Sequence, residues 1–305
     1  MKLVIGVITY NKSTAKYLPY FLSSLETQSF KDFKIIVQDN SDIKNNENKK
    51  IIENNNSFDI EFNYSGENIG FARANNKTIK RAIDFKAEYI LFLNPDMILE
   101  SDMVEKLIKT MEKDKDIASA APKILKWNFI DNKKTNIIDT CGIKEISALR
   151  FIDIGQGKID KNQHDDTEIL GPSGATALYR VIALEKVKDE YGYFDERMFM
   201  YKEDCDLAYR LKLAGYGSKL VKDAIVYHDR TAVGVGETDL VVALNRKNKS
   251  KQVKSWSYKN QHIIFKKHWK SLNLKRKIEV VYFAFKMFVY ALLFEQYLLK
   301  NYKTL

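Results

Sequence analysis

The segment Tyr89-Ile90-Leu91-Phe92-Leu93-Asn94-Pro95-Asp96 contains an apolar run that stops abruptly at Asn-Pro-Asp. A short continuous apolar run, without alternation of apolar and polar residues, is typical of a strand buried on both faces of a parallel sheet. The Asn-Pro-Asp sequence favours a turn, because proline fixes its backbone and cannot donate a hydrogen bond to a sheet. The segment therefore predicts a central strand that ends in a carboxylate, Asp96.

The flanking residues continue this pattern, because apolar runs alternate with helical patterns throughout residues 1–125. Such alternation is the sequence signature of βαβ units. We predict strands at residues 3–9, 34–39, 60–64, 89–94 and 117–122. We predict helices at residues 16–28, 46–56, 71–87 and 101–114, the last with Ser101 as its N-cap. The expected fold is α/β, with a Rossmann-like, mostly parallel central sheet flanked by helices.

The second half of the chain contains fewer predicted elements. Residues 126–170 are polar and rich in Asn, Lys and Asp, and we expect them to form an irregular excursion over the rim of a site. A helix at residues 203–214 is predicted to end at Gly215, a residue type that suits the position after a helix. A strand at residues 218–227 is predicted to deliver His228 at its end.

Polar residues follow several of the predicted strands. Ligands of an open parallel sheet bind beyond the carboxyl ends of its strands. We therefore expect three strand ends to converge on one ligand: Thr9-Tyr10-Asn11, Asp39-Asn40-Ser41 and Asn94-Pro95-Asp96. Asp96 is the best single metal candidate, because Mg²⁺ needs only one or two carboxylates when substrate phosphates and waters complete its shell. A purely structural turn is the alternative interpretation of Asn-Pro-Asp.

A second acidic segment, Glu203-Asp204-Cys205-Asp206, lies where a helix is predicted to begin. Carboxylates in a first helical turn complement the helix dipole, and this structural role explains one or two of the acids. It does not explain the aromatic residues Phe199 and Tyr201 beside them. We expect Asp206 to pair with Arg210 four residues later, and Cys205 to be a small buried side chain rather than a nucleophile.

Composition limits the class of protein. With 305 residues, 45% of them apolar and 12% aromatic, the chain can bury a sizeable core. Cys141 and Cys205 are too few for a disulfide framework and lack the spacing of a zinc site, which favours a reducing compartment. Lys2 leads directly into the first predicted strand rather than into a signal sequence, so we expect a cytoplasmic protein.

The formal net charge of +10 is concentrated in the C-terminal residues 246–305. This segment holds 15 Lys and Arg residues against Glu279 and Glu295, so it carries +13 and residues 1–245 carry −3. The uneven charge predicts a basic C-terminal extension on a nearly neutral main domain. Because the main domain is slightly acidic and shows no nucleic-acid-binding motif, we expect no nucleic-acid partner.

Residues 278–299 are strongly apolar but are interrupted by charged residues such as Lys286. The longest uncharged run, Met287–Phe294, is far shorter than the ~20 residues that span a bilayer. One interpretation of residues 246–305 is a membrane-surface helix, with the basic residues facing anionic headgroups. A helical hairpin packed on the domain and a homodimer contact are the alternatives.

Several motifs in consistent order resemble family 2 glycosyltransferases of the GT-A fold, and most closely the bacterial rhamnosyltransferase-like branch. The resemblance covers roughly residues 3–235. It is carried by Val7-Ile8-Thr9-Tyr10-Asn11, Asp39-Asn40-Ser41, Asn68-Ile69-Gly70-Phe71-Ala72-Arg73-Ala74-Asn75-Asn76, Leu93-Asn94-Pro95-Asp96, Gly174-Ala175 with Arg180, Phe194-Asp195-Glu196, Glu203-Asp204-Cys205-Asp206-Leu207, Gly215-Tyr216 and His228. It implies a GT-A domain over 1–235, with a nucleotide-binding half (1–125) and an acceptor and catalytic half (126–235), before a basic, helical extension (236–305).

The resemblance also implies roles for the donor-binding residues. Asp39 would read a pyrimidine base by accepting its ring N3–H, with the backbone of Thr9, Tyr10 and Asn11 around it. The ribose and diphosphate would lie against Asn68, Gly70 and Arg73. Arg73 can offer a guanidinium fork to phosphate oxygens, and an ordinary exposed helix residue is the alternative.

The metal and the base are implied in the same way. The family carries an Asp-x-Asp triplet where this chain has Asn94-Pro95-Asp96, which leaves Asp96 as one strong anionic ligand. His228 resembles the histidine that completes the metal shell, and an imidazole ligand favours Mn²⁺ somewhat over Mg²⁺. Asp204 is the expected catalytic base, with Glu203 beside it as a like charge that would raise its basicity.

Together these residues predict an inverting, metal-assisted glycosyltransferase. It would move a sugar, with rhamnose favoured by the resemblance, from a dTDP- or UDP-linked donor to a hydroxyl of a glycan or lipid-linked saccharide. A nucleotidyltransferase is one alternative, although Tyr10-Asn11-Lys12-Ser13 is not the Gly-rich, basic phosphate loop that this class shows after its first strand. A non-catalytic protein that binds sugar nucleotides is the other.

Overall fold

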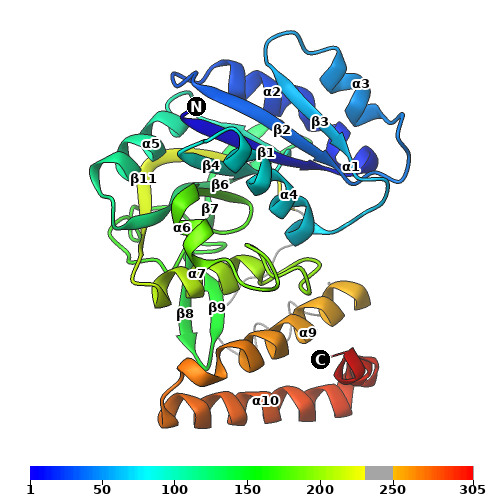
Figure 1. Ribbon diagram of the computed structural model, residues 1–305, viewed down its shortest axis with the longest axis vertical. Helices are drawn as coiled ribbons and strands as arrows, with labels where there is room; N and C mark the ends of the chain where they lie inside the picture. Colours follow the sequence, from blue (N-terminus) through cyan, green and yellow to red (C-terminus); the bar gives the residue numbers. More distant parts are fainter. Residues whose placement is uncertain (231–249, 305) are drawn as a thin grey trace.

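The computed structural model describes residues 1–230 and 250–304, and the predicted boundary between residues 235 and 236 lies outside them. Figure 1 shows a twisted sheet flanked by helices, with the C-terminal helices as a separate layer below it. The strands are β1 (Leu3–Thr9), β2 (Phe33–Asp39), β3 (Ile60–Tyr64), β4 (Tyr89–Leu93), β5 (Met97–Leu99), β6 (Ile117–Asn128), β7 (Lys133–Thr140), β8 (Ile143–Ser147), β9 (Arg150–Asp153), β10 (Thr176–Arg180) and β11 (Gly217–His228). The α-helices are α1 (Asn11–Ala15), α2 (Leu18–Glu26), α3 (Glu47–Glu53), α4 (Phe71–Asp84), α5 (Met103–Lys113), α6 (Val181–Val187), α7 (Glu203–Leu213), α9 (Lys251–His268) and α10 (Leu274–Phe294).

The central sheet is mostly parallel, as the sequence predicts, and has the order β3-β2-β1-β4-β10-β6-β11-β5, with β7 paired to β6. β10 is antiparallel to both of its neighbours, β4 and β6, whereas β11 is parallel to β6. Consequently β6 and β11 run in the same direction as β1, β2 and β4. The carboxyl ends of these strands, and the residues that follow them, lie along one edge of the sheet.

Burial on both faces explains why these strands are continuous apolar runs. Alternate residues of β1 enter two hydrophobic cores, with Leu3 and Ile5 in one and Val4 in the other. Helices α2 and α5 close the first core, and helices α4 and α6 close the second. The predicted α/β architecture, with helices on both faces of the sheet, is confirmed.

The prediction of an irregular segment at residues 126–170 holds for residues 154–170 but is wrong for residues 126–153. β6 continues to Asn128, β7 pairs with it, and β8 and β9 form a hairpin. These strands are stabilised by pairing with residues distant in sequence and by burial of a few side chains such as Ile138 and Ile143. A polar local composition does not reveal such pairing.

Other elements also differ from the prediction. The helix expected at 16–28 is divided into α1 and α2, because Pro19 lies in the first turn of a new helix. α5 follows Asp102 rather than Ser101, so Ser101 is not its N-cap. β10 and α6 were not predicted, since the short run from Thr176 is followed immediately by a helix without a conventional cap.

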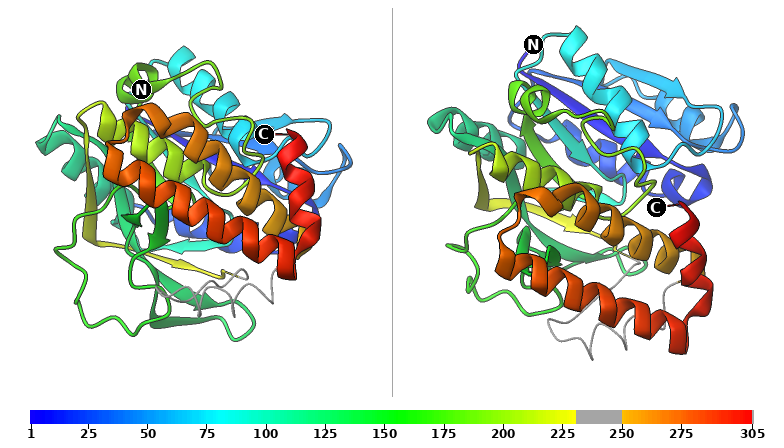
Figure 2. Two further views of the ribbon diagram at one scale, coloured as in Figure 1. Left: turned by 90° about the horizontal axis from the view of Figure 1, so that it is seen from below. Right: turned by 60° about the horizontal axis from the view of Figure 1, so that its bottom comes forward.

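The C-terminal extension is helical, as predicted. α9 lies between α7 and α10, and the 3₁₀ helices Trp269–Ser271 and Gln296–Thr304 join and follow them (Figures 1 and 2). Buried side chains of α9 and α10, including Ile264 and Val280, share one core with Met198 and Tyr209 of the domain. Within the described ranges, no helix is long and apolar enough to cross a membrane.

Candidate active site

The ends of β1 and β2 form a polar loop cluster around Asp39. Its carboxylate is fully buried and accepts hydrogen bonds from Thr9 Oγ1 (2.7 Å), Ser41 Oγ (2.7 Å) and Asn46 Nδ2 (2.6 Å). An ionised carboxylate offers about four acceptor positions, so these three bonds leave about one unused. The cluster therefore combines a rigid support with one remaining acceptor position.

Tyr10 and Asn11 continue from β1 at the exposed rim of this cluster. The backbone N–H of Asn11 donates to Ser41 Oγ (2.8 Å), and its side chain donates to Asp42 (2.7 Å). Asn11 has a φ of 47°, in the left-handed region that asparagine tolerates better than most residues. These contacts bring the ends of β1 and β2 together, as the sequence predicts.

The loop before α4 connects this cluster to the second acidic segment. Asn68 Oδ1 accepts from the N–H of Gly70 (3.1 Å), which has a φ of +81°. A Cβ at this glycine would lie 2.5 Å from the carbonyl oxygen of Phe199, which also accepts from the N–H of Phe71 (2.7 Å). Only glycine allows this close approach, so the two loops, far apart in sequence, meet directly.

Arg73 lies on the first turn of α4, but its guanidinium pairs with Glu196 (3.3 Å). Both side chains are substantially exposed, at 53% and 35%. The neighbouring Asn76 hydrogen-bonds the backbone of Phe194 in both directions, through Nδ2 and Oδ1 (both 2.8 Å). Asn76 therefore anchors the loop that precedes the acidic segment.

Asp96 and His228 meet at the carboxyl edge of the sheet. The Nε2 atom of His228 lies 3.3 Å from Asp96 Oδ1, and its Nδ1 atom lies 2.8 Å from Asp139 Oδ2. Burial by itself would lower the pKa of His228. The charge of Asp96 and the hydrogen bond with Asp139 outweigh burial and raise that pKa to about 9.

The Asp96–His228 pair fits a divalent cation. Asp96 Oδ1 is buried and makes no hydrogen bond of good geometry within the described part of the chain, and its ion-pair partner is His228 Nε2 at 3.3 Å. A cation held by these two atoms would take the place of the Nε2 proton, because a metal binds the deprotonated imidazole nitrogen. The described residues contain no cluster of three or more acidic, His or Cys side chains suited to a metal. One carboxylate and one imidazole nonetheless suffice when substrate phosphates and waters supply the remaining ligands.

Asp139 and Arg230 were not among the predicted site residues. Asp139 is fully buried on β7, and Arg230 reaches both Asp139 (3.4 Å) and Asp153 (3.0 Å). The pKa of Asp139 would be raised by burial, but His228 and Arg230 hold it below its usual range. The sequence offered no signal for Asp139, because it lies within the polar segment that was expected to be irregular.

The second acidic segment begins α7, as predicted. Asp204 Oδ2 accepts from the backbone N–H of Gly174 (2.9 Å), and Oδ1 accepts from the N–H of Cys205 (2.8 Å). Before the helix, Tyr201 and Lys202 have φ values of 74° and 71°. Two successive non-glycine residues in the left-handed region store strain, which is concentrated at functional sites in folded proteins.

Glu203 differs from Asp204 in its surroundings. Its side chain is buried, and burial followed by the charge of Asp204 raises its pKa well above the usual range. Its Oε2 atom has no hydrogen-bond partner within the described residues. Glu203 therefore lies in a place that favours its protonated form, unlike an exposed carboxylate at the start of a helix.

A pocket of about 170 Å³ opens beside Asp204. Its walls come from the β8–β9 hairpin, from the loop before α7 and from α9, which contributes Val253 and Ser257. Asp153 and Arg230 also line it. The predicted base thus faces a small polar space that the C-terminal extension helps to enclose.

Asp206 forms a different kind of site. It is fully buried and pairs with Arg210 (2.9 Å), as predicted, and also with Lys267 (2.8 Å) and His268 (2.8 Å) of α9. Burial would raise the pKa of Asp206, but these partners hold it far below its usual range. Asp206 therefore joins α7 to the C-terminal extension.

The two cysteines are buried and unpaired. Burial raises the pKa of Cys141 to about 12 and that of Cys205 well above its usual range. Neither thiol is a thiolate at neutral pH. The prediction that Cys205 is a small buried side chain is confirmed.

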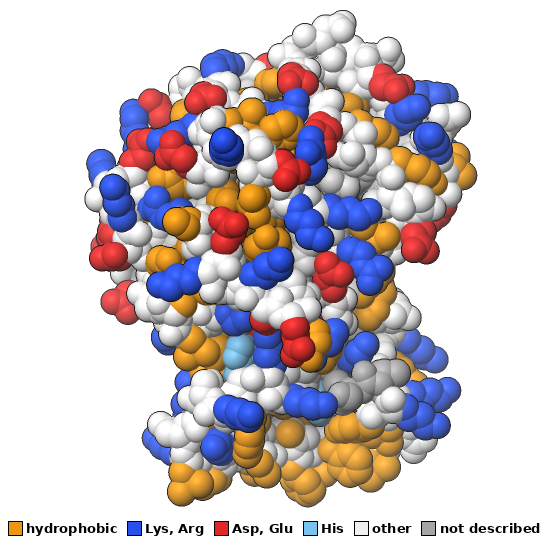
Figure 3. All heavy atoms as spheres, viewed as in Figure 1, with side chains coloured by type: hydrophobic (Ala, Val, Ile, Leu, Met, Phe, Trp, Pro, Cys, Tyr) orange, Lys and Arg blue, Asp and Glu red, His pale blue; other side chains and the backbone are white. Residues whose placement is uncertain are grey.

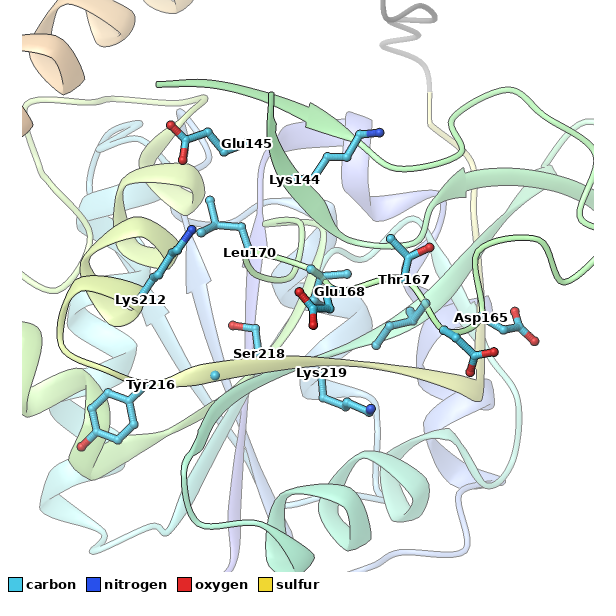
Figure 4. A pocket seen from close by; sticks show the side chains of 14 residues that line it. Lys144, Glu145, Asp165, Thr167, Glu168, Leu170, Lys212, Tyr216, Ser218 and Lys219 are labelled. Carbon is cyan, nitrogen blue, oxygen red and sulfur yellow. The ribbon is translucent and has the colours of Figure 1, made fainter. Parts of the chain in front are cut away.

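A larger pocket, about 600 Å³, lies at the start of β11 (Figure 4). Its labelled side chains include Lys144, Glu168 and Lys212, so it mixes both signs of charge. It lies at the opposite end of β11 from His228, away from the carboxyl edge where ligands bind to such sheets. The candidate active site is therefore the smaller pocket together with the Asp96–His228 pair.

Residues 4–188 match the family model of glycosyl transferase family 2, which covers more than half of the chain. The chain belongs to this family. This glycosyltransferase is 28% identical over 223 residues to the rhamnosyltransferase WbbL of Escherichia coli (strain K12), across 70% of the chain and 78% of WbbL. It is 25% identical to the low-salt glycan biosynthesis hexosyltransferase Agl10 of Haloferax volcanii, across 50% of the chain and 47% of Agl10.

Solved structures show that the glycosyltransferase shares the fold of known enzymes. The mannosyltransferase PcManGT from Pyrobaculum calidifontis, solved with GDP-Man and Mn²⁺, matches with a TM-score of 0.58 at 14% identity, over 98% of this chain and 72% of the other. Residues 1–349 of S. aureus TarS match with a TM-score of 0.53 at 18% identity, over 95% and 81%. Another S. aureus TarS structure matches over 84% of this chain but 42% of its own length. The predicted GT-A fold is confirmed.

Proposed function

We propose that this family 2 glycosyltransferase is an inverting, metal-assisted enzyme with Asp204 as its base. The observation that carries the proposal is the position of Asp204, whose carboxylate lines a small pocket and is held by the N–H of Gly174. Inversion requires an acceptor hydroxyl to attack the anomeric carbon while a base takes its proton. The pocket beside Asp204 is the proposed place for that hydroxyl.

Glu203 is proposed to act differently from Asp204. Burial favours the protonated form of its side chain, so it would support the shape of the pocket rather than act as the main base. This division fits a general rule of catalytic pairs, in which two neighbouring carboxyl groups take different roles because their environments separate their pKa values. Asp204 is the only one of the two that we propose as base.

Asp96 and His228 are the proposed ligands of the divalent cation, Mn²⁺ or Mg²⁺. A cation there would neutralise the charge that develops on the leaving nucleoside diphosphate. Asp139 holds Nδ1 of His228, and so leaves Nε2 directed at Asp96. Support comes from fold relatives, because both PcManGT and GalNAc-T7 were solved with Mn²⁺.

The proposed donor site extends along the carboxyl edge from Asp39 to the Asn68–Gly70 loop. Asp39 would read a pyrimidine base through its remaining acceptor position, with Thr9, Tyr10 and Asn11 beside it. Asn68 and Gly70 would approach the ribose and diphosphate, and Arg73 would exchange Glu196 for phosphate oxygens. The backbone N–H of Asn94 donates a hydrogen bond to the carbonyl oxygen of Ala175 (3.0 Å), which fixes the end of β4. Asn94 would therefore lie against the diphosphate, next to Asp96.

The favoured sugar is rhamnose, carried by a dTDP or UDP donor, and the favoured acceptor is a glycan or lipid-linked saccharide. The similarity to WbbL supports the sugar, and the name of Agl10 supports a glycan product. The enzyme is proposed to act in the cytoplasm. We propose residues 1–235 as the GT-A domain and residues 236–305 as its extension.

The test is transfer and donor hydrolysis with a panel of nucleotide sugars, with chelator and with added Mn²⁺ or Mg²⁺. Asp204→Asn should lower turnover by on the order of 10²–10⁴ and leave donor binding nearly unchanged, because only the proton acceptor is lost. Asp166→Asn removes an exposed carboxylate from the larger pocket and serves as the control.

Each alternative has its own result. A folded chain that binds donor without transfer or hydrolysis would be a non-catalytic binding protein. Formation of a nucleotide sugar from a sugar phosphate would show a nucleotidyltransferase. Near-normal turnover of Asp204→Asn would remove Asp204 from the mechanism, and full activity in chelator would remove the metal.

A further inference from the structure

The outer face of α10 is an apolar surface at the end of the molecule opposite the sheet. Its side chains are exposed by between 39% and 75% of their area, although they are aliphatic or aromatic: Leu274, Ile278, Val281, Tyr282, Phe285, Phe288, Leu292 and Leu293. Figure 3 shows hydrophobic side chains (orange) gathered along the lower edge of the molecule, where Figure 1 places α10, with Lys and Arg beside them. A continuous patch of this kind on a folded chain marks an interaction surface.

Helical geometry places these residues on one face. At about 100° per residue, Leu274, Ile278, Val281, Phe285 and Leu292 fall within a narrow sector of the helix. The opposite side of α10 is buried against α9 and the β8–β9 hairpin through residues such as Val280 and Ala291. Helix α10 therefore has two apolar faces, one packed against the rest of the chain and one exposed.

Lysines border the outward face on both sides. By the same geometry, Lys277 lies at one margin, and Lys275 and Lys286 lie at the other. The extension as a whole carries +13. An apolar sector between rows of cationic side chains is the pattern of a helix that lies in the interface of an anionic membrane.

We infer that the outward face of α10 binds the surface of an anionic lipid bilayer. The helix would lie in the plane of the interface, with Ile278 and Phe285 among the acyl chains and the lysines at the headgroups. A second copy of this chain is a poorer occupant, because a two-fold contact would bring two strongly basic extensions together. Spanning the bilayer is not required, and none of the described helices is suited to it.

The bound surface would be rigidly connected to the active site. α9 lies between α10 and the domain, and its Asn260 donates to the carbonyl groups of Met200 (2.9 Å) and Tyr201 (2.7 Å). Trp256 of α9 stacks on Phe199, with ring centroids 4.8 Å apart. A membrane contact on α10 would therefore hold the Asp204 pocket at a fixed height and orientation above the lipid.

The biological role of this membrane contact rests on the proposed function. The contact would suit an acceptor that is a lipid-linked saccharide with its reacting hydroxyl near the headgroups. Membrane binding itself does not depend on catalysis. It also differs from a tethered tail, because α9 supplies Val253 and Ser257 to the wall of the Asp204 pocket. The extension is then both a membrane contact and a part of the acceptor site.

The experiment is co-sedimentation of the full chain with vesicles of phosphatidylcholine alone, or with about one third phosphatidylglycerol, at low and high salt. The chain should bind only the anionic vesicles, and less at high salt. The double variant Ile278→Asp/Phe285→Asp should weaken binding by on the order of a hundredfold, because two exposed apolar side chains no longer enter the lipid. Lys275→Gln should weaken it about fivefold.

The matched control is Ile182→Asp/Leu213→Asp, which places the same two charges on exposed apolar positions of α6 and α7. It should bind vesicles like the unchanged chain. Thermal unfolding of each variant shows that the chain is folded. Donor hydrolysis in solution, without vesicles, should be equal in all of them, so a failure of the proposed enzyme activity is seen separately from a failure to bind lipid.

Two results would overturn the inference. The first is a failure of specific lipid binding, in which the unchanged chain leaves anionic vesicles unbound at low salt or the face variant binds them as well as the control does. In the second case, sedimentation analysis would find a dimer that the Ile278→Asp/Phe285→Asp variant converts to a monomer, and the surface would then belong to a second copy. An unchanged monomer that loses vesicle binding only in the face variant supports the inference.

Discussion

Asp96 and Asp206 are both carboxylates beside a histidine, yet their surroundings differ. Asp206 is fully buried and is held by Arg210, Lys267 and His268. Asp96 is about one-quarter exposed, and its buried Oδ1 lies 3.3 Å from Nε2 of His228 and makes no hydrogen bond of good geometry among the described residues. The first carboxylate is satisfied by the chain itself, and the second is arranged for something that the chain does not supply.

The two residues are of the same type, so residue type does not tell a structural carboxylate from a functional one. The number of hydrogen-bond and ion-pair partners that each carboxylate has does. A buried carboxylate held by an arginine, a lysine and a histidine stabilises the fold, and losing it weakens the contact between α7 and α9. A carboxylate with an unused oxygen at the carboxyl edge of a sheet is available to a ligand. Substitutions at the two positions should therefore affect different measurements.

The largest effect should follow from Asp206→Ala. It leaves His268 and Arg210 without this buried carboxylate, although Lys267 keeps Asp189 (2.7 Å) and Asp195 (3.0 Å), and should cost about 3–5 kcal/mol of unfolding free energy. Urea unfolding followed by circular dichroism measures this, with the exposed Asp166→Ala as control. A variant as stable as the unchanged chain would show that α9 is not joined to α7 through this carboxylate.

The next effect is expected at the other member of the pair. Asp96→Ala should lower the urea midpoint less than Asp206→Ala does, because it removes one ion pair, with His228, rather than contacts with three partners. It should weaken Mn²⁺ binding in the presence of a nucleoside diphosphate by more than about a hundredfold. Electron paramagnetic resonance of free Mn²⁺ gives the affinity. Loss of stability without loss of affinity would reverse the distinction between the two carboxylates.

A smaller effect should follow from Asp139→Asn, which keeps the shape of the side chain but weakens its hold on His228. Second-sphere carboxylates of this kind typically contribute 10- to 100-fold in metal affinity, so the loss should be about that size. The same Mn²⁺ measurement applies. His228→Ala provides the upper limit, and an Asp139→Asn affinity equal to that of the unchanged chain would remove Asp139 from the site.

The smallest effect concerns acid stability. The pKa of Asp206 is depressed in the folded chain, so its contribution is complete above the ordinary carboxyl value near 4 and declines as the pH falls below it. Unfolding free energy measured from pH 6 to pH 3 should therefore fall less steeply in Asp206→Asn than in the unchanged chain. If the unfolding free energies of the two proteins changed with pH at the same rate, Asp206 would not be ionised in the folded state.

Much of the nucleotide-binding half was predictable because its signals are local. The apolar runs of β1 and β4 and the polar residues at their ends lie within a few positions of one another, so Asp39, Asp96 and the start of α7 were located correctly. Burial on both faces leaves a direct trace in such strands. The pair between Asp206 and Arg210 was equally readable, since residues four apart share one helix face.

The remaining features depend on contacts between residues far apart in the chain. Pairing of β7 with β6 brings Asp139 to His228, and packing of α9 on α7 brings Lys267 and His268 to Asp206. Neither residue carries a local pattern that points to its partner. The sequence by itself determined the parallel sheet, its ligand-binding edge and the basic extension. Only the tertiary structure decided which carboxylates are satisfied, because that depends on which distant side chains share a buried space.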